Sequence, residues 1–600
     1  MAFDYKVFKT DYRDILCGVI NKNFVGQSIK LCGWVSKRRD HGKLIFIDLR
    51  DFSGIVQLVF NSSLNLKAHE IAKELRLEYV IQIEGVVSAR AEDTINKELE
   101  TGEIEIVVNQ INILSKSKTP PFLIEEREGV EELTRLKYRY IDLRAKEMQR
   151  NLRLKSLVMS ITRNYLSSNG FVEIETPILA KSTPEGARDF LVPSRLNPNK
   201  FYALPQSPQL FKQILMFSGF DRIFQLARCF RDEDLRADRQ PEFTQIDLEM
   251  TFVKQEDVMT LIEHLMKEIL EKALGIKIKV PFQRLSWYEA MSTYGSDKPD
   301  LRFELKIQDI TNIFLNSDIK IFKETIGKNG VIKCLKIEDS KSISRKDLDE
   351  LVLIAKNNGA GGLIWIKVDE NLNLQSPIAK FLKENEKDEL VQFLDLKKNN
   401  LLLITSDNFL TASSVLGIIR NQIALKLNLI NTNEFNFLWI YDFPLFEWDE
   451  KEKRYKSVHH PFTMPSSDTI EFLDSDPLKV KSISYDIILN GNELGGGSIR
   501  INDLKLQSKI FKILGINLEK AKDNFGFFLK AMDYGTPPHG GIALGLDRLV
   551  MVLGNLKSIR EVIAFPKTQS AIDMMTESPS YVSESQLKEL NIKLIKVSED

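Results

Sequence analysis

Cysteine is scarce in this chain of 600 residues, and its positions are widely separated. The four cysteines are Cys17, Cys32, Cys229 and Cys334, and no two of them form a C-x-x-C pair. This spacing argues against a disulfide framework and against a zinc knuckle. We therefore expect a protein of a reducing compartment.

Long apolar runs are also missing. No run approaches the roughly 18 residues that a membrane span needs, and the first residues, MAFDYKVFKTDYRD, are charged from the fourth on. With 30 glycines, 20 prolines and a hydrophobic share of 43%, the composition excludes collagen-like and disordered chains. The sequence predicts a folded, soluble, cytoplasmic protein.

Neither sign of charge is in excess, because 83 Lys and Arg residues face 84 Asp and Glu residues. This balance excludes a globally basic nucleic-acid coat, so any nucleic-acid contact must come from local patches. G-x-S-x-G, Walker and HExxH sequences are absent as well, and hydrolase and P-loop chemistry lack their central residues. The length predicts about three to six domains.

Residues 28–114 contain five short β-rich runs and a helical stretch near 67–76, a pattern typical of an OB-fold barrel. Between the first two runs stands KRRDHGK, followed by Phe46. Basic groups beside an aromatic ring suit phosphate neutralisation and base stacking. The alternative is a solvated hairpin with a core phenylalanine.

A hinge is expected after the barrel, since Pro120 and Pro121 can continue neither a strand ladder nor a helix. A helix is then predicted that stops at Gly170 and precedes the strand FVEIETPIL. One face of this helix carries Leu154, Val158, Ile161 and Tyr165.

Two strand-like runs, RIFQLARCFR and PEFTQIDLEMTFV, occupy residues 222–253. In the second run Gln245, Asp247 and Glu249 share one face. Such a row either faces bulk water or lines a pocket for a polar ligand. From about 291 to 420 helices and strands alternate, which indicates an inserted α/β domain without a chemical motif.

Three segments carry residues that suit phosphate chemistry. Arg231 in FRDED can fork two phosphate oxygens, unless this cluster is an exposed turn whose charges satisfy one another. Near GNELGGGS, Asp486 and Glu493 can share Mg²⁺, or the glycines form a structural turn. Arg548 stands near the start of an apolar helix and can meet an anion or a buried carboxylate.

His459 and His460 leave three roles open: metal ligands, proton carriers and ordinary loop residues. Without a cysteine or a third spaced histidine, these two do not indicate a zinc site. The arginines, the two carboxylates and the polar sheet together favour phosphoryl-group chemistry without a protein nucleophile.

Taken in order, the strand ending at Pro177, FRDEDLRADRQPEFTQID and GLDRL resemble motifs 1, 2 and 3 of class II aminoacyl-tRNA synthetases. STPEGARDF, QSPQLFKQ, HHPFT, GNELGGGSIR and the GAGG insert extend the resemblance to the bacterial type of aspartyl-tRNA synthetase over nearly the whole chain.

The resemblance implies an α+β multidomain fold with an N-terminal OB-fold β-barrel, a class II antiparallel-sheet core and an inserted α/β domain of the GAD type. The expected parts are an anticodon-binding domain at 1–118, a hinge at 119–146, the first part of the core with motifs 1 and 2 at 147–290, the insert at 291–420, and the second part of the core with motif 3 and a C-terminal extension at 421–600.

The activity that the resemblance implies is that of an aspartate–tRNA ligase. The aspartate α-carboxylate attacks the α-phosphate of ATP, and the aspartyl group of the resulting adenylate passes to the 3′ end of tRNA-Asp. Arg231, Arg548 and His460 are the expected catalytic residues, and Asp486 and Glu493 the expected Mg²⁺ ligands. Contacts with ATP are expected from Arg231, Asp232, Glu233, Gln240, Glu493, Gly545, Leu546, Asp547 and Arg548. Contacts with aspartate are expected from Glu185, Gln209, Lys212, Arg231, Asp247, His459 and Arg500.

Charge supports this assignment. Lys212 and Arg500 supply two positive charges for one side-chain carboxylate, whereas neutral asparagine would leave them underpaired at a cost of several kcal/mol. We therefore expect selectivity against asparagine.

In the barrel, the resemblance assigns anticodon contacts to Arg39, His41, Phe46 and Gln57. Histidine at position 41 is often found in enzymes of this type that also charge tRNA-Asn, so the resemblance extends to that tRNA. It also implies a homodimer, for which the sequence offers a basic, partly apolar helix at 147–169.

Two alternatives are an asparaginyl- or lysyl-tRNA synthetase and a non-catalytic RNA-binding protein with a synthetase fold. The insert, Lys212 and Arg500 argue against the first alternative. The charged residues of the expected ATP site argue against the second, since a relic should have lost them.

Overall fold

The computed structural model describes residues 9–183 and 186–595, so Glu185 lies outside the described residues. The chain forms two compact units. The first contains the described residues up to Leu157, together with Leu235–Gln240 and Ser558–Val582. The second contains the described residues of Val158–Asp234, Pro241–Lys557 and those from Ser583 on.

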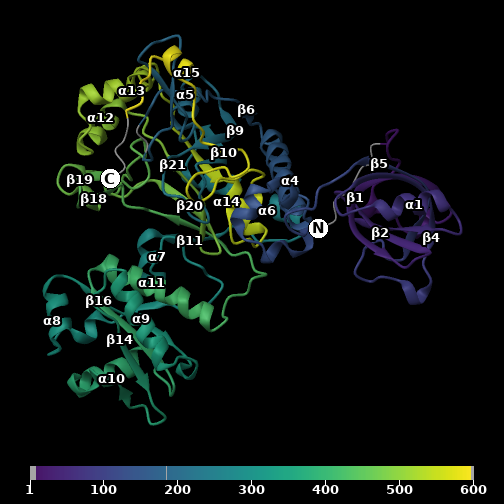
Figure 1. Ribbon diagram of the computed structural model, residues 1–600. Coiled ribbons are helices and arrows are strands. Elements are labelled where there is room, and N and C mark those ends of the chain that lie inside the picture. The colour runs from purple at the N-terminus through teal and green to yellow at the C-terminus, as the bar shows by residue number, and fades with distance from the viewer. Residues whose placement is uncertain (1–8, 184–185, 596–600) are drawn as a thin grey trace. The chain divides into compact units, whose positions relative to one another are not determined.

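A closed barrel of five strands in the order β1-β2-β3-β5-β4 dominates the first unit (Figure 1). Its strands and helix are β1 (Ser28–Asp40), β2 (Leu44–Arg50), β3 (Ile55–Asn61), α1 (Leu66–Glu74), β4 (Val80–Ala89) and β5 (Ile104–Ser115). Burial alternates along β1 and β2, and aliphatic side chains such as Leu31, Val35 and Ile47 fill the interior. The OB-fold expectation is confirmed.

After the barrel the first unit continues through short helices. These are α2 (Glu132–Lys137), α3 (Arg139–Asp142) and the first half of α4 (Lys146–Ser168). A buried ion network joins them to the segment near Glu561: Asp142 accepts hydrogen bonds from Arg127 (2.9 Å) and Arg139 (2.5 Å), and Arg127 also pairs with Glu561 (3.0 Å). Charges buried this deeply are tolerated because each carboxylate has a guanidinium partner.

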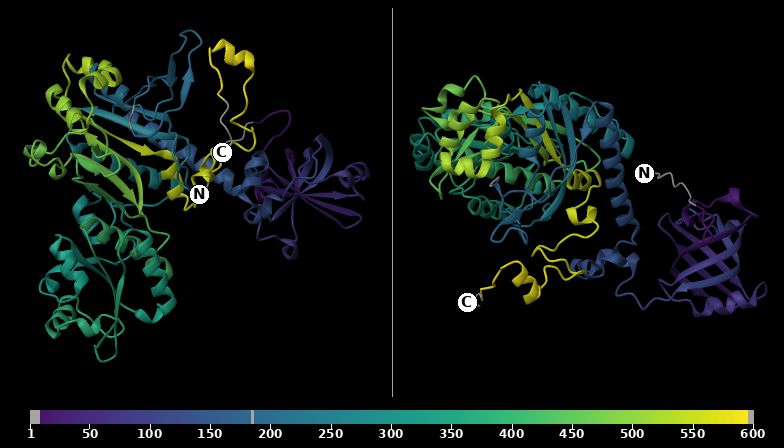
Figure 2. Two further views of the ribbon diagram at one scale, coloured as in Figure 1. Left: turned by 60° about the vertical axis from the view of Figure 1, so that its left-hand side comes forward. Right: turned by 90° about the horizontal axis from the view of Figure 1, so that it is seen from above.

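The second unit is built on an eight-stranded sheet in the order β11-β17-β20-β21-β22-β10-β9-β6 (Figures 1 and 2). The strands are β6 (Val172–Glu173), β9 (Arg222–Phe230), β10 (Glu242–Thr251), β11 (Gln283–Ser286), β17 (Phe437–Tyr441), β20 (Ser484–Leu489), β21 (Asn492–Ile499) and β22 (His539–Gly545). The pairs from β17 to β9 are antiparallel, and only the outer pairs β11–β17 and β6–β9 are parallel. This arrangement confirms the antiparallel core.

Helices and small hairpins complete this part of the second unit. They are α5 (Gln209–Phe217), α6 (Gln255–Leu274), α7 (Trp287–Tyr294), α12 (Leu504–Ile513), α13 (Leu518–Met532), α14 (Leu546–Leu553), α15 (Glu584–Glu589) and the hairpins β7 (Leu191–Pro193)–β8 (Phe201–Ala203) and β18 (Phe446–Asp449)–β19 (Arg454–Ser457). Within the described residues, no helix combines the length and apolarity that crossing a bilayer requires.

Local patterns predicted two core elements well. Helix α4 ends at Ser168, two residues before Gly170, whose φ of +79° favours glycine. On its predicted apolar face, Leu154, Val158 and Ile161 are buried. In β10 the residues of both faces are buried, which excludes the bulk-water reading of its polar row. The strand expected at FVEIETPIL is reduced to Val172–Glu173, and the segment beyond it does not continue the ladder.

The inserted α/β domain is present as a separate five-stranded sheet in the order β12-β13-β16-β14-β15. Its elements are β12 (Ile307–Asp309), α8 (Lys320–Gly327), β13 (Val331–Ile337), α9 (Arg345–Asn357), β14 (Ile364–Val368), β15 (Leu374–Gln375), α10 (Glu384–Phe393), β16 (Leu401–Asp407) and α11 (Phe409–Lys426). Two aliphatic clusters pack against this sheet: Leu335 and Leu403 belong to one, and Ile332 and Ile404, which point to the opposite face, belong to the other.

Candidate functional site

Four buried charges form the centre of the site in the second unit. Lys212 of α5 donates to Asp247 Oδ1 (2.5 Å) and lies 3.1 Å from Glu249 Oε2, both on β10. Arg500, just after β21, forks Glu249 with Nε and Nη2 at 2.9 and 3.1 Å. All four residues are at most 3% exposed. Two cations thus face two carboxylates, and the group is neutral as it stands.

This pairing corrects the simpler charge argument from the sequence. Lys212 and Arg500 are not unpaired cations, because each forms ion pairs with the carboxylates of Asp247 or Glu249. No role for Glu249 followed from its place on the polar face of β10. Room for its carboxylate comes from Gly541 on β22, where a Cβ would lie 2.1 Å from Glu249 Oε2.

The electrostatics of this group fix its protonation. Burial would raise the pKa of Glu249, but Arg500 and Lys212 outweigh it and lower that pKa to about 2. Burial raises the pKa of Asp247, although Lys212 opposes the shift. Glu249 is therefore a permanent anion that orients the two cations.

Among the expected aspartate-binding residues, three buried polar atoms lack a hydrogen-bond partner within the described part of the chain. They are Asp247 Oδ2, Gln209 Nε2 and His459 Nδ1. An acceptor and a donor left open beside buried charges are costly unless a ligand or water satisfies them. The site therefore fits a small polar ligand that offers both a donor and an acceptor.

The two histidines contact different parts of the site. His460 Nε2 lies 2.6 Å from Arg500 Nη1, and burial together with the Arg500 charge lowers the pKa of His460 well below its usual value. His459 Nε2 lies 3.0 Å from Asp486 Oδ1, and although burial lowers its pKa, the Asp486 charge raises it to a net increase. The loop thus joins the four-charge group to the acidic residue Asp486.

Phe462 anchors the loop that carries His459 and His460. Its fully buried ring packs with centroid distances of 4.9, 5.5 and 6.1 Å against Phe528, Phe525 and Phe511 from α12 and α13. Aromatic packing of this kind fixes the backbone two residues after His460.

A carboxylate pair lies on the neighbouring strands. Asp486 of β20 and Glu493 of β21 are close enough that burial and the Asp486 charge both raise the pKa of Glu493. Gly495, Gly496 and Gly497 of GNELGGGS lie in β21, and Gly491 lies in the turn before it with a φ of +78°, so the glycines do not form a loop around a phosphate. At Gly496 a Cβ would lie 2.4 Å from Asp486 Oδ1, so this glycine makes room for the carboxylate.

Arg548, in the first turn of α14, approaches the same pair. Its Nη1 donates to the backbone oxygen of Glu493 at 2.7 Å. Asp547 fixes α14 to the sheet, because its Oδ2 accepts a hydrogen bond from Thr244 N on β10 (2.8 Å). Leu546 and Asp547 are buried and Gly545 ends β22, so we expect these residues to contribute to a nucleotide site mainly through backbone and position.

Arg231 directly follows β9. Its guanidinium lies 5.1 Å from the ring centroid of Phe243 on β10, and its Nε makes a long contact of 3.4 Å with Gln206 O. Arg231 and Phe243 are both half-buried, and their arrangement offers a cation beside a flat apolar surface, features that suit a nucleotide. Asp232 pairs loosely with Arg188 (3.8 Å), and Glu233 follows in the same loop.

Gln240 belongs to the first unit, whereas Arg231 and Glu233 belong to the second. Its side-chain amide is engaged: Oε1 accepts from Lys567 N (2.7 Å), and Nε2 donates to Lys567 O (3.0 Å). The expected contact of Gln240 with ATP stays a prediction.

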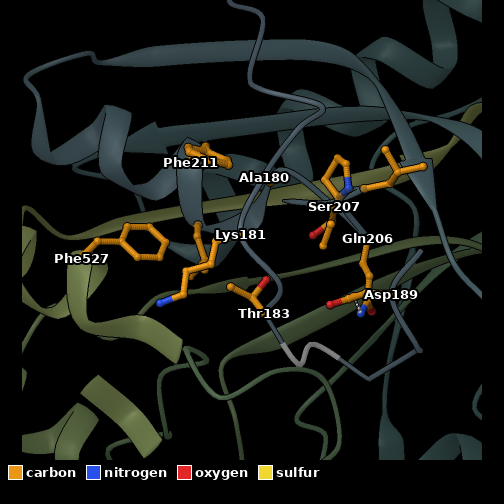
Figure 3. Close-up of a pocket in the computed structure, with 12 residues that line it drawn as sticks. Ala180, Lys181, Thr183, Asp189, Gln206, Ser207, Phe211 and Phe527 are labelled. Carbon is orange, nitrogen blue, oxygen red and sulfur yellow. Dashed lines mark hydrogen bonds between the residues drawn. The ribbon is translucent and has the colours of Figure 1, made fainter. Parts of the chain in front are cut away.

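Figure 3 shows a small pocket beside the start of α5. Asp189 and Gln206 lie side by side in its wall and share a hydrogen bond, while Ser207, Phe211 and Phe527 contribute further to the lining. Thr183 also lines this pocket and is the last described residue before position 184. The expected contact of Glu185 with the ligand therefore concerns a residue outside the described part of the chain.

In the first unit the four barrel residues come together on the outer face of β1, β2 and β3. Arg39 lies over the Phe46 ring (5.9 Å), and the His41 ring meets Phe46 edge-on (5.8 Å). Arg39 Nη2 also donates to Gln57 Oε1 (2.9 Å). The solvated hairpin with a core phenylalanine is excluded, because Phe46 is only half-buried and points away from the barrel interior.

Two acidic residues missed by sequence reasoning complete this surface. Asp48 accepts from Arg39 (2.8 Å), and Glu105 of β5 accepts from Gln57 Nε2 (3.0 Å). The alternation of β2 places Asp48 on the same face as Phe46, which is a signal that could have identified it. The surface thus combines a ring with fixed donors and acceptors, as base recognition requires.

His539 predicts a dependence of stability on pH. It is fully buried, and burial, with added repulsion from Arg500 and Lys212, lowers its pKa to about 4 against the attraction of Glu249. Between about pH 6.5 and 4 the unfolded chain binds a proton at this group that the folded chain does not. The free energy of unfolding therefore decreases by about 1.4 kcal/mol for each unit by which the pH is lowered. The apparent melting temperature of His539→Asn should therefore approach that of the unmodified protein as pH falls from 7.5 to 5. A gap that stays constant over this range would contradict the assignment.

The chain matches two family models. Residues 131–569 match the model described as tRNA synthetases class II (D, K and N), and residues 29–114 match the OB-fold nucleic acid binding domain. The chain is 52% identical over 582 residues to the aspartate–tRNA(Asp/Asn) ligase of Thermoanaerobacter pseudethanolicus, covering 97% of this chain and 98% of that relative. The ligase of the same name from Thermodesulfovibrio yellowstonii is also 52% identical, with 97% and 100% covered.

Solved structures show the same fold. The asparaginyl-tRNA synthetase of Pyrococcus horikoshii complexed with asparaginyl-adenylate has a TM-score of 0.59 at 19% identity, covering 93% of this chain and 99% of that one. The Entamoeba histolytica asparaginyl-tRNA synthetase in complex with asparaginyl-adenylate has a TM-score of 0.56 at 20% identity, covering 92% and 98%. The chain therefore belongs to the class II tRNA synthetases of the D, K and N group and, within them, to the family of aspartate–tRNA(Asp/Asn) ligases.

Proposed function

We propose that the chain activates L-aspartate with ATP and transfers the aspartyl group to the 3′ end of tRNA-Asp and also of tRNA-Asn. The observation that carries this proposal is the buried group of Lys212, Arg500, Asp247 and Glu249, with an open acceptor and an open donor beside it. The proposal also agrees with the names of the full-length relatives.

The amino acid would occupy this group in one orientation. Asp247 Oδ2 is the open acceptor for the ammonium group, and Gln209 Nε2 is an open donor for a carboxylate oxygen. The Arg500 Nη1 contact with His460 is one that the side-chain carboxylate of aspartate can replace, because a carboxylate binds a guanidinium more strongly than a neutral imidazole does. Asparagine brings no negative charge, so it gains less from this exchange.

ATP would bind along Arg231, Phe243, Glu493 and Arg548. Arg231 would hold the α-phosphate, Phe243 offers a surface for the base, and Arg548 would reach the terminal phosphates. Glu233 and Gly545 are proposed to frame the nucleotide.

The carboxylate pair fits a divalent cation. No cluster of three or more His, Cys, Asp or Glu side chains suited to a metal occurs in the described ranges 9–183 and 186–595. Mg²⁺ is commonly held by one or two carboxylates together with substrate phosphates. Burial, and after it repulsion from Asp486, raises the pKa of Glu493, and a bound cation would relieve that repulsion. Asp486 and Glu493 would hold the ion, which would neutralise charge on the phosphates.

The proposed reaction has two steps. An oxygen of the aspartate α-carboxylate forms a bond to the α-phosphorus, and the bond from that phosphorus to the pyrophosphate oxygen breaks. A hydroxyl of the terminal adenosine of tRNA then attacks the activated carbonyl carbon, loses its proton, and AMP leaves. The side chains position the reactants and neutralise charge, which is how phosphoryl and acyl transfer proceed without a protein nucleophile.

The barrel surface is proposed to bind the anticodon through Phe46, Arg39, His41 and Gln57. Phe46→Ala should raise the KM for tRNA about tenfold or more, since stacking of one base contributes about 1–3 kcal/mol. ATP–pyrophosphate exchange, which needs no tRNA, should not change. Tyr12→Ala, which removes an exposed aromatic side chain elsewhere in the first unit, is the control. An unchanged KM for tRNA in Phe46→Ala would exclude this surface as the anticodon site.

The remaining proposals start from the resemblance. We propose that the enzyme acts as a homodimer in the cytoplasm, as its family resemblance implies. The hairpin β7–β8 carries exposed Leu191, Leu196 and Phe201, which offer an apolar surface for such an assembly.

The decisive test of the function compares substrates. ATP–pyrophosphate exchange is measured with aspartate, asparagine and lysine, and charging is then measured with tRNA-Asp and tRNA-Asn at equal concentrations. We expect exchange with aspartate alone and aspartylation of both tRNAs. Exchange driven by asparagine or lysine would refute the substrate, and charging of tRNA-Asp alone would refute the wider tRNA range.

A further inference from the structure

In the first unit, a C-terminal strap of residues 558–568 holds the short segment Leu235–Gln240. Near one end of this segment, Ala237 O accepts hydrogen bonds from Ile559 N (2.9 Å) and Ser558 Oγ (3.3 Å). At the other end, the Gln240 amide makes a paired contact with the backbone of Lys567. Both ends of the segment are therefore fixed by residues more than 300 positions later in the chain.

Arg560 connects these two hydrogen-bonded segments to helix α2. Its Nε donates to Lys567 O (3.1 Å), the same carbonyl that accepts from Gln240 Nε2 (3.0 Å). Its Nη1 lies 3.2 and 3.3 Å from the two oxygens of Glu132, the first residue of α2. The backbone oxygen of Arg560 accepts from Arg139 Nη2 (2.8 Å). Only a guanidinium can reach the carbonyl and the carboxylate at once with this geometry.

The segment that is held matters because of its place in the chain. It continues directly from Arg231 and Glu233 and runs into β10, the strand that carries Phe243 and Asp247. The Gln240 amide is occupied by backbone groups, with Nε2 also 3.3 Å from Arg239 O. The side-chain amide thus holds the backbone at Lys567 and at Arg239.

We propose that Arg560 is a positioning residue for ATP. Arg560 holds the Leu235–Gln240 segment through Lys567 O, which also accepts from Gln240. Its contact with Glu132 connects this segment to α2. Arg560 acts through other residues and is not itself a nucleotide ligand. The inference rests on the proposed binding of ATP by the loop at Arg231.

The test uses the full-length protein and measures KM for ATP and for aspartate separately in ATP–pyrophosphate exchange. Arg560→Met should raise KM for ATP about tenfold and leave KM for aspartate within about twofold, because the amino-acid group lies on other elements. Arg560→Lys can keep only one of the two contacts, so its KM for ATP should lie between those of the unmodified protein and Arg560→Met. Glu132→Gln, which leaves Arg560 in place, should show a smaller increase in KM for ATP.

Arg135→Met is the matched control, because Arg135 lies on α2 like Glu132 and pairs with Glu561 (3.3 Å) but has no described contact with Lys567. We expect both KM values of this variant to stay near those of the unmodified protein. If Arg560→Met does not fold, Arg560→Lys and Glu132→Gln carry the comparison. A normal KM for ATP in the folded Arg560 variants, or an equal rise of both KM values, would overturn the inference.

The outcome is separable from that of the proposed function. If the unmodified protein failed to exchange with aspartate but did so with another amino acid, the substrate proposal would fail while KM for ATP could still be compared. If it exchanged with no amino acid, calorimetric titration with ATP would compare the variants directly. Weaker ATP binding in Arg560→Met than in Arg135→Met would support the positioning role in either case.

Discussion

Replacing Lys212 by methionine is expected to lower kcat/KM for aspartate in ATP–pyrophosphate exchange by about a thousandfold. Methionine keeps the length of the side chain but removes the cation between Asp247 Oδ1 and Glu249 Oε2. Breaking a fully buried pair by removing one partner costs about 3–5 kcal/mol, because a charge is left without compensation. The remaining group then carries a net negative charge and repels the substrate carboxylates.

The same substitution also affects folding, so a second variant is needed. In Lys212→Met with Asp247→Asn, the number of buried anions again matches the number of cations, and the melting temperature should recover part of its loss. Activation should stay low, because the cation and the proposed ammonium acceptor are both gone. Near-normal activation of aspartate by a folded Lys212→Met protein would refute the role of this residue.

Arg231→Lys is expected to reduce the rate of exchange by about a hundredfold or more. Lysine keeps the charge but cannot fork two phosphate oxygens or lie flat beside the Phe243 ring as the guanidinium does. Loss of one preorganised donor to a developing anion typically costs about 10²–10³ in rate. The effect should appear mainly in kcat, since the contact strengthens as charge develops at the α-phosphate.

Arg228→Lys provides the control for Arg231. Arg228 lies on β9, the strand that Arg231 directly follows, but it is paired with Glu242 (2.6 Å) and donates to Thr244 Oγ1 (3.1 Å). Its replacement should change the exchange rate by no more than about twofold, because an exposed ion pair contributes little. Equal losses in both variants would indicate a general disturbance of β9 and not a role in phosphate binding.

Features with a local cause were predictable from the sequence. The face of α4 with Leu154 and Val158, the barrel strands and the polar row of β10 all follow from side-chain periodicity, which depends on backbone geometry within a few residues. The order of short motifs then indicated the family, which the comparisons confirm. The length of β6 was not predictable, since a strand ends where its neighbour stops pairing.

Features that depend on pairing between distant segments were not predictable. Glu249 and Arg500 are 251 positions apart, and their bidentate contact requires the register of β10, β22 and β21. The sequence therefore suggested two free cations, whereas the fold supplies two carboxylates that balance them. Gln240 is a similar case, because its amide partner, Lys567, lies 327 positions later.

By itself, the sequence determined which kinds of residue are present and in what order, and this was enough for the fold class, the family and the list of candidate residues. Only the tertiary structure decided which side chains share a buried space, which of their atoms are already satisfied and which stay open for a ligand. The physical reason is that hydrogen bonds and ion pairs act over a few ångströms, whereas the residues that form this site are separated by hundreds of positions along the chain.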